Sequence, residues 1–310
     1  MDVSTTAEIA ARSGPRAPRR HRVTLAAGVL VVLLIIAVLF IGRGANQQEE
    51  VSGAEFTSNT PGVPAGTRLT VHEGDIIVKE PGAYVDGLDV HGLIFIRAPD
   101  VTIMNTIVRG RPVEKNSALV SNFTTGYPFT VRDSELIATH PSPYINGVIG
   151  SNFTLRNVVI SSVVDGVHIT GDDVVVESSW IRDHLHFAVD PNHNGGPSHD
   201  DSIQIQAGAN IRIADNVMTG PRAAVMQITQ DRGPVSNVRF LRNEVDNGFC
   251  SVNVDENDYG PIRGLVVANN VFGRNTSHFN CAIIAPPSTT VVSRGNFFTD
   301  GAPVTITRGR

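Results

Sequence analysis

Two adjacent aspartates precede a short stretch of alternating apolar and polar residues in "SHDDSIQIQAG", residues 198–208. Adjacent carboxylates are unusual there, because aspartate competes for its own backbone and repels a like charge. A related stretch, "DGVHIT", begins at Asp165. When the two stretches are aligned, Asp165 and Asp201 take the same position and Asp200 lies beside them. Clustered carboxylates raise at least one pKa, and a protonated acid beside an ionised base is what glycoside hydrolysis requires.

The same cluster has a second interpretation. Ca²⁺ prefers oxygen ligands, so Asp165, Asp200 and Asp201 are also candidate calcium ligands. Both interpretations require the three carboxyl groups to lie within about 10 Å of one another. A structure in which Asp165 points into the core would exclude both of them.

Two rows of hydrogen-bonding side chains are predicted to follow the aligned strands. Val167, Ile169, Ile203 and Ile205 face inward, so the residues between them face outward. The first row is His168, Gln204, Gln227 and Asn253, and the second is Thr170, Gln206, Thr229 and Asp255. Such rows suit the hydroxyl groups of a sugar chain, so we predict that His168, Gln204, Gln206, Gln227 and Asn253 bind a polysaccharide. Solvated strand faces are polar in any case, and the sequence leaves that alternative open.

A long histidine-rich segment separates the two aligned stretches. "RDHLHFAVDPNHNGGPSHDD", residues 182–201, contains His184, His186, His193 and His199 together with Asp183 and Asp190. Loops on a rigid scaffold are common sites of function, so we predict a functional loop in which His193 binds substrate and His199 is catalytic. Metal-ligand spacing such as H-x-x-x-H is absent from it. A polar loop with a turn at 195–197 is the alternative.

The elements that must position these residues are short β-branched runs separated by Gly, Asn and Asp. Eight runs superimpose, starting at residues 101, 129, 153, 174, 211, 238, 265 and 291. A second set falls between them, starting at residues 146, 165, 201, 224, 250 and 281. Two or three strands every ~20–30 residues predict a solenoid whose coils stack on one another. A propeller would need four strands per ~40–45 residues.

One asparagine recurs at the sixth position of the last four runs of the first set: Asn216, Asn243, Asn270 and Asn296. Asparagine tolerates the left-handed conformation of turns, and stacked copies can hydrogen-bond along the axis of the solenoid. We therefore predict a structural asparagine ladder.

The strand pattern, the ladder and "PGAYVDGLDVHGLIFIRAPDVTIMNTIV" (residues 81–108) resemble the pectate-lyase superfamily. The resemblance covers residues 62–310 and implies an all-β, single-stranded right-handed parallel β-helix. This fold hosts lyases, hydrolases, epimerases and non-enzymatic fibres, so it leaves the chemistry open.

The aspartates resemble those of the polygalacturonase-type glycoside hydrolases. That resemblance implies that Asp200 is the general acid and that Asp165 and Asp201 activate water in an inverting reaction. The chain departs from this pattern, because "PRAAV" (221–225) replaces the family's Gly-His-Gly and no Arg-Ile-Lys follows.

Two further functions fit the sequence. A lyase acting on a uronate-type glycan needs a base and a cation, for which His199 or His168 and Arg222 or Arg182 are candidates. A non-catalytic, carbohydrate-binding or structural solenoid at the cell surface is the alternative to both enzymes.

The first 50 residues differ from the rest of the 310-residue chain. "VTLAAGVLVVLLIIAVLFI", residues 23–41, carries no charge and matches the ~30 Å hydrocarbon core of a bilayer. A preceding arginine-rich segment predicts a cytoplasmic tail (1–22), a transmembrane signal anchor (23–41), a linker (42–61) and an extracytoplasmic β-helix domain (62–310). A cleaved signal peptide normally has an apolar region of only 7–15 residues. The net charge of −5 argues against a nucleic-acid partner.

The chain has two cysteines, Cys250 and Cys281, and each opens a strand of the second set. Their separation is about one coil, and Cα atoms of adjacent coils lie about 4.8 Å apart. This distance is within the range for a disulfide, and the predicted extracytoplasmic location would preserve the bond. Two buried thiols are the alternative.

Overall fold

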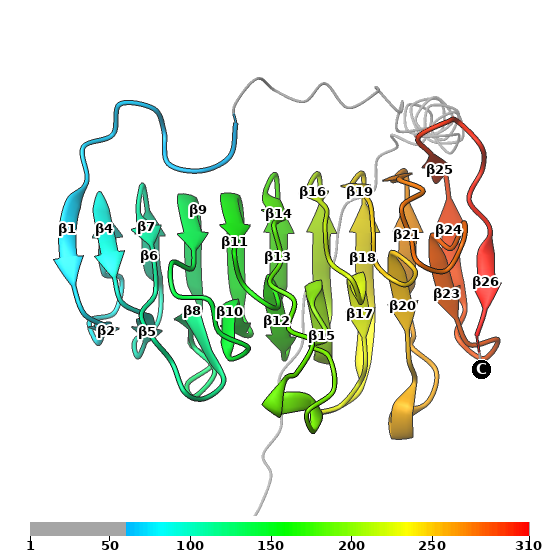
Figure 1. Ribbon diagram of the computed structural model, residues 1–310, viewed down its shortest axis with the longest axis horizontal. Helices are drawn as coiled ribbons and strands as arrows, with labels where there is room; N and C mark the ends of the chain where they lie inside the picture. The colour runs from blue at the N-terminus through cyan, green and yellow to red at the C-terminus, as the bar shows by residue number, and fades with distance from the viewer. Residues whose placement is uncertain (1–59, 310) are drawn as a thin grey trace, which may run out of the picture. The chain divides into compact units, whose positions relative to one another are not determined.

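The computed structural model describes residues 60–309, and within them the fold is an all-β solenoid (Figure 1). It contains 26 short strands, and every pairing between them is parallel. Two short 3₁₀ helices, η1 (Pro191–His193) and η2 (Asn257–Tyr259), lie in loops. The predicted all-β stacked-coil architecture is therefore confirmed.

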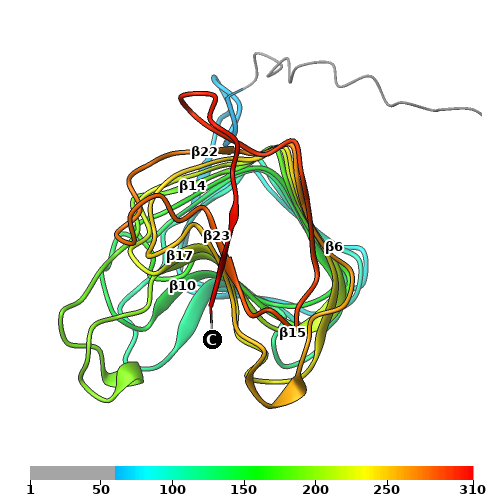
Figure 2. The same cartoon turned by 90° about the vertical axis from the view of Figure 1, so that its right-hand side faces the viewer.

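The strands form three columns that run along the solenoid, and the coils superimpose when viewed along its axis (Figure 2). The first column consists of β2 (Ile76–Val78), β5 (Ile94–Ile96), β8 (Ser117–Ser121), β10 (Ile145–Gly150), β12 (Val167–Thr170), the first part of β15 (Asp201–Ala214), β17 (Ala224–Ile228), β20 (Val252–Val254), β23 (Ile283–Ala285) and β26 (Ile306–Arg308).

The second column consists of β3 (Tyr84–Asp86), β6 (Val101–Met104), the first parts of β9 (Phe129–Ile137) and β11 (Phe153–Ser161), β13 (Val174–Glu177), the second part of β15, β18 (Val235–Leu241), β21 (Leu265–Ala268) and β24 (Val291–Arg294). The third consists of β1 (Thr70–Glu73), β4 (Leu88–His91), β7 (Ile107–Val108), the second parts of β9 and β11, β14 (Trp180–Arg182), β16 (Val217–Met218), β19 (Glu244–Val245), β22 (Val271–Phe272) and β25 (Phe297–Phe298).

The register of the strands agrees with the sequence alignment. The eight runs of the first set pair along the second column, for example Val174 with Ile211 and Ile211 with Val238. The second set pairs along the first column, where Val167 lies beside Ile203. These inward-facing residues are fully buried and form the continuous core that holds the outward-facing residues at fixed positions.

The asparagine ladder is confirmed. The side-chain amide of Asn216 donates to Asn243 Oδ1 at 3.0 Å, that of Asn243 to Asn270 Oδ1 at 3.1 Å, and that of Asn270 to Asn296 Oδ1 at 2.9 Å. The left-handed backbone does not fall on these asparagines. It falls on the residue before each of them, which is Asp215, Arg242, Asn269 or Gly295. The ladder asparagines therefore contribute side-chain hydrogen bonds, and the residues before them adopt the left-handed turn conformation.

The predicted tail, anchor and most of the linker (1–59) lie outside the described residues. Between residues 60 and 309 no helix is long and apolar enough to cross a membrane.

Candidate functional site

A cleft of about 700 Å³ lies on the outward face of the first column, between β12, β15, β17 and β20 and the loop that follows β14. Most residues predicted to form the site line it: Asp165, His168, His193, His199, Asp201, Gln204, Gln206, Gln227 and Asn253. The parallel register brings these residues together from four successive coils.

The first predicted polar row is present in this cleft. His168 pairs with Gln204, Gln204 with Gln227, and Gln227 with Asn253. On the next coil the partner of Asn253 is Ile284, so the polar row ends there.

The prediction of the second polar row is wrong for its first member, Thr170. A β-bulge between Ile169 and Thr170 shifts the register, so that Thr170 pairs with Ala207 and not with Gln206. Gln206, Thr229 and Asp255 line the cleft, whereas Thr170 is not among the lining residues. The extra residue on β15 allows Gln206 to line the cleft, and as a result Gln206 is no longer paired with Thr170.

Asp165 and Asp201 lie side by side on adjacent coils, as the alignment predicts. The backbone N–H of Asp201 donates to Asp165 Oδ1 at 3.0 Å, and the backbone N–H of Gly166 donates to Asp201 O at 2.9 Å. Asp165 is 6% exposed but lines the cleft, so it does not point into the apolar core. His168 Nδ1 lies 3.4 Å from Asp165 Oδ2.

Asp201 has the properties of a protonated acid. Its burial raises the pKa of the carboxyl group well above the ordinary value, and the charges of Asp165 and Asp200 raise the pKa further. The Ala224 N–H opposes this shift in part. Even so, neither carboxyl oxygen of Asp201 has a hydrogen-bond partner of normal geometry among the described residues. A neutral carboxylic acid can donate a proton, and Asp201 lines the cleft although both of its carboxyl oxygens are buried in the free chain.

Asp200 does not join this pair in the cleft. His186 Nδ1 lies 2.6 Å from Asp200 Oδ1, and the backbone N–H of Arg222 donates to Asp200 Oδ2 at 2.6 Å. Neither Asp200 nor Arg222 lines the cleft. Asp200 precedes β15, and its two carboxyl oxygens are held by His186 and by the Arg222 N–H instead of facing the cleft. The sequence resemblance that made Asp200 the general acid is therefore not matched by its position.

The calcium interpretation does not fit this arrangement. It required three converging carboxylates, and one of them, Asp200, is occupied by His186 and a backbone amide. Within residues 60–309 no group of three His, Cys, Asp or Glu side chains is arranged to hold a metal ion.

The loop after β14 forms one wall of the cleft. The rings of His193 and His199 stack with their centroids 4.2 Å apart, and both residues line the cleft. Asp190 Oδ1 accepts from the N–H of Asn192 and so caps η1, and Asn192 Nδ2 donates to Pro143 O at 3.1 Å. The loop is thereby tied to its own turn and to the connection that leads into β10.

His184 and His186, which belong to the same loop, are not lining residues. His184 lies between the carbonyl of Val164 and the hydroxyl of Ser202, each 3.0 Å from a ring nitrogen. Burial lowers the pKa of His184, so this histidine stays neutral and holds the loop against the solenoid.

Buried polar atoms without partners are concentrated in the cleft. In the described part of the chain they occur on six residues, five of which line it: His168, Asp201, Gln204, Thr229 and Asn253. Leaving such an atom unpaired costs about 1–3 kcal/mol, so their accumulation in one place indicates a surface made to bind a polar ligand or ordered water.

The charge of the cleft differs from that expected for a uronate site. Five aspartates line it: Asp165, Asp190, Asp201, Asp231 and Asp255. The described lining contains no Arg or Lys side chain. Arg182, a candidate lyase cation, instead lies over the ring of Trp180. Arg232 contacts a lining residue, since its Nε donates to Gln206 Oε1 at 2.6 Å.

Sequence reasoning missed several lining residues. Asp231 lies in a loop, where a strand alignment gives no information. Phe249 precedes Cys250 directly and lines the cleft, and this adjacency to an aligned position was the available signal. Asn146, which the alignment placed before Asp165, accepts the Asp165 N–H through its side-chain oxygen at 3.2 Å.

The fold and the cleft define a parallel β-solenoid with a polar, acidic groove on one face. No family model and no curated protein matches the chain. A solved structure that resembles it is described as "Crystal structure of Agl-KA catalytic domain", with a TM-score of 0.49 and 14% sequence identity. The match covers 73% of this chain and 47% of that chain, so this chain spans about half the length of the structure that it resembles.

Proposed function

We propose that the chain is a glycoside hydrolase that cleaves a neutral polysaccharide in the cleft, with Asp201 as the general acid and Asp165 as the second carboxylate. The observation that carries the proposal is the pair itself: a buried carboxyl with a raised pKa and no hydrogen-bond partner lies beside a second carboxyl at the same edge of the cleft. Glycoside hydrolysis uses two carboxyl groups in these different states.

The roles follow from the environments of the two groups. Asp201, protonated, donates its proton to the oxygen of the scissile glycosidic bond as that bond breaks. A water molecule forms a bond to the anomeric carbon as the glycosidic bond breaks, and Asp165 receives the proton of that water. The amide and imidazole groups of the polar row (His168, Gln204, Gln227 and Asn253) bind sugar hydroxyls. In doing so, His168, Gln204 and Asn253 satisfy their unpaired buried atoms.

The substrate class follows from the charge of the cleft. A uronate polymer would bring one carboxylate per residue into a groove lined by four aspartates besides the protonated Asp201, and like charges repel. A neutral glycan meets no such barrier. For the same reason hydrolysis is favoured over β-elimination, which needs a cation to stabilise the uronate carboxylate.

The finer fold and the location are part of the proposal. The resemblance of the strand pattern supports a right-handed parallel β-helix of the pectate-lyase superfamily. The apolar run 23–41 with its basic flank supports a signal anchor with residues 62–310 outside the cytoplasm. The Cys250–Cys281 disulfide supports an oxidising compartment.

The test is a substrate screen with the full-length chain. Neutral glucans, mannans and xylans and uronic-acid polymers are offered, and new reducing ends are measured separately from the ultraviolet absorbance of an unsaturated product. We expect reducing ends from a neutral glycan and no unsaturated product. Unsaturated product from a uronate would instead support a lyase.

Variants separate catalysis from binding. Asp201→Asn and Asp165→Asn should each lower kcat by at least ~100-fold while polysaccharide binding remains. Asp183→Asn, an exposed change on the loop beside the cleft, is the control and should leave kcat unaltered. If glycan binding is found but no variant changes any turnover, the chain is a carbohydrate-binding solenoid and not an enzyme.

A further inference from the structure

The cleft changes character at its end nearest β20 and β23. The polar row stops at Asn253, and Ile284 follows it on the next coil. Beside this end lies Phe249, a cleft-lining residue that is 47% exposed. The backbone N–H of Phe249 donates to Ala223 O at 2.8 Å, and Asn253 Nδ2 points to the same oxygen at 3.4 Å. The phenyl ring therefore begins where the hydrogen-bonding row ends.

The ring of Phe249 is supported on one side by His278. Their centroids lie 5.1 Å apart and their planes are inclined by 22°, so the two rings are stacked. A ring stacked on one face and half-exposed in a cleft presents its remaining surface to a ligand.

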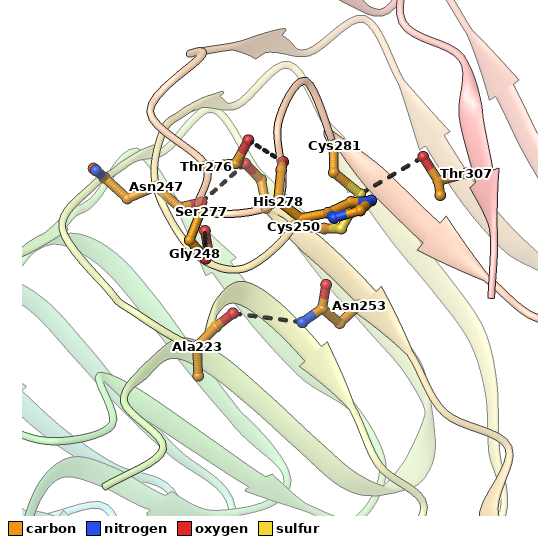
Figure 3. Close-up of a disulfide and its surroundings, with 11 residues drawn as sticks. Ala223, Asn247, Gly248, Cys250, Asn253, Thr276, Ser277, His278, Cys281 and Thr307 are labelled. Carbon is orange, nitrogen blue, oxygen red and sulfur yellow. Dashed lines mark hydrogen bonds between the residues drawn. A yellow bond between two sulfur atoms is a disulfide. The ribbon is translucent and has the colours of Figure 1, made fainter. Parts of the chain in front are cut away.

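Both rings are held by the same covalent bond. The disulfide joins Cys250, which follows Phe249, to Cys281, which lies three residues after His278 (Figure 3). The backbone N–H of His278 donates to Phe249 O at 2.9 Å, and that of Ser277 donates to Gly248 O at 2.9 Å. Loop 273–281 is thus fastened to the coil that carries Phe249 at several points on either side of the stack.

We propose that Phe249, backed by His278 and fastened by the Cys250–Cys281 disulfide, is a sugar-stacking subsite at the end of the cleft. A pyranose ring presents an apolar face of C–H bonds, whose positive ends suit the negative face of an aromatic ring. A neutral hexose unit fits this place because Phe249 offers no hydrogen bond and no charge. The subsite rests on the proposed function, because it extends the same glycan beyond the unit held by the polar row.

The consequence is a dependence on chain length. A short oligosaccharide that occupies only the polar row and the carboxyl pair gains nothing from Phe249. A longer one buries the exposed ring surface, which is worth roughly tenfold in affinity.

The test measures binding of neutral cello-, malto- and manno-oligosaccharides of increasing length by calorimetry. It uses the full-length chain carrying Asp201→Asn, so that the ligand survives. Adding Phe249→Ala should weaken binding of the long ligands about tenfold and leave the shortest binder unchanged. Phe249→Trp should restore the length dependence. Phe279→Ala is the matched control, because Phe279 lies on the same loop, is 84% exposed and does not line the cleft.

A second arm tests the disulfide. Cys250→Ser with Cys281→Ser should reduce the affinity for long ligands by a similar factor, and adding Phe249→Ala to this pair should cause little further loss. Circular dichroism at the temperature of the binding experiment verifies that each variant is folded.

The outcomes separate the two proposals. If Phe249→Ala weakens short and long ligands alike, or behaves as Phe279→Ala does, the subsite is rejected and the proposed function stands. If the parent chain binds none of these neutral oligosaccharides and cleaves no neutral polymer, the proposed function fails and the subsite fails with it.

Discussion

At the scale of single residues, the neighbours Asp200 and Asp201 differ in their hydrogen bonds. Asp200 has partners for both carboxyl oxygens, whereas the carboxyl oxygens of Asp201 are buried without one. Asp200 is fully buried, accepts a hydrogen bond from Arg222 N through one carboxyl oxygen and lies 2.6 Å from His186 Nδ1 through the other. Asp201 is equally buried and has no such partner. The energetic cost of an uncompensated buried carboxyl is avoided by keeping the proton.

The raised pKa of Asp201 predicts a pH dependence of stability. Above the ordinary pKa of 3.8, the unfolded chain has released this proton while the folded chain still binds it. The unfolded state then binds fewer protons, so the free energy of unfolding falls as pH rises, until the raised pKa of the folded state is passed. Replacement of Asp201 by Asn removes this contribution to the pH dependence of the free energy of unfolding.

We therefore expect Asp201→Asn to melt at a higher temperature than the unaltered chain at neutral pH, with the difference shrinking toward pH 4, while activity is lost. Thermal unfolding across this pH range measures it, with Asp183→Asn as the control. A variant less stable than the parent at neutral pH would contradict a protonated, uncompensated Asp201.

Asp165 should respond differently to substitution. Its Oδ1 accepts the buried N–H of Asp201, and an asparagine oxygen can accept the same hydrogen bond. Asp165→Ala leaves that N–H unpaired, at a cost of about 1–3 kcal/mol. We expect Asp165→Ala to lower the free energy of unfolding in urea by that amount and Asp165→Asn to lower it by clearly less. Equal losses would show that the hydrogen bond does not contribute.

At the scale of the elements, the recurring runs predict the register because inward positions repeat from coil to coil. A shift of one residue would turn each buried Val or Ile to the outside, so the alignment of apolar positions in sequence fixes the pairing in space. The pairings of Val167 with Ile203 and of Ile211 with Val238 follow from this.

The alignment fails where the structure is not periodic. The bulge after Ile169 adds a residue that no apolar pattern reveals, and Thr170 is misplaced as a result. Asp200 precedes its strand, so the strand pattern does not fix its direction. Phe249 and Asp190 lie in connections, where the position of a side chain depends on packing with segments distant in sequence.

The asparagine ladder makes a second prediction at this scale. Asn243 Oδ1 accepts from both the backbone N–H and the side-chain amide of Asn216, and Asn243 Nδ2 donates to Ile213 O at 3.1 Å. Asn243→Ala leaves these buried groups unpaired. We expect the free energy of unfolding in urea to fall by about 3 kcal/mol or more. Arg239→Ala, at an exposed position on β18, should cost less than about 0.5 kcal/mol. Similar losses for the two variants would contradict the structural role of the ladder.

At the scale of the whole molecule, a solenoid has contacts only between neighbouring coils, so its stability is a sum of local interfaces. A link between coils that are already adjacent acts mainly on the unfolded chain. The disulfide joins residues 31 apart in sequence with Cα atoms 4.7 Å apart.

Closing a loop of this length stabilises the fold by roughly 3–4 kcal/mol in the chain-entropy model. We expect a reductant to lower the melting temperature of the parent chain and to leave that of the Cys250→Ser, Cys281→Ser variant unaltered. Thiol counting on the unreduced, denatured chain should find no free thiol. Two free thiols per chain would mean that the bond does not form in the protein as isolated.

The disulfide and the N-terminal sequence lead to one prediction about location. A bond of this kind persists outside the cytoplasm, and the uncharged run 23–41 is long enough to span a bilayer after a segment with five arginines (Arg12, Arg16, Arg19, Arg20 and Arg22). We expect the positive flank to stay inside, so that the β-solenoid and its cleft face the exterior, where polysaccharides are found. We expect the full-length chain to fractionate with membranes and to resist extraction by salt and alkaline carbonate. We also expect its solenoid to be accessible to an added protease on intact cells.

The matched variant replaces four arginines by Gln: Arg16, Arg19, Arg20 and Arg22. This change removes the charge that sets the orientation and should reduce the accessibility of the solenoid to the protease. Recovery of only a soluble form that starts near residue 45 would reject the anchor and leave a secreted solenoid in its place.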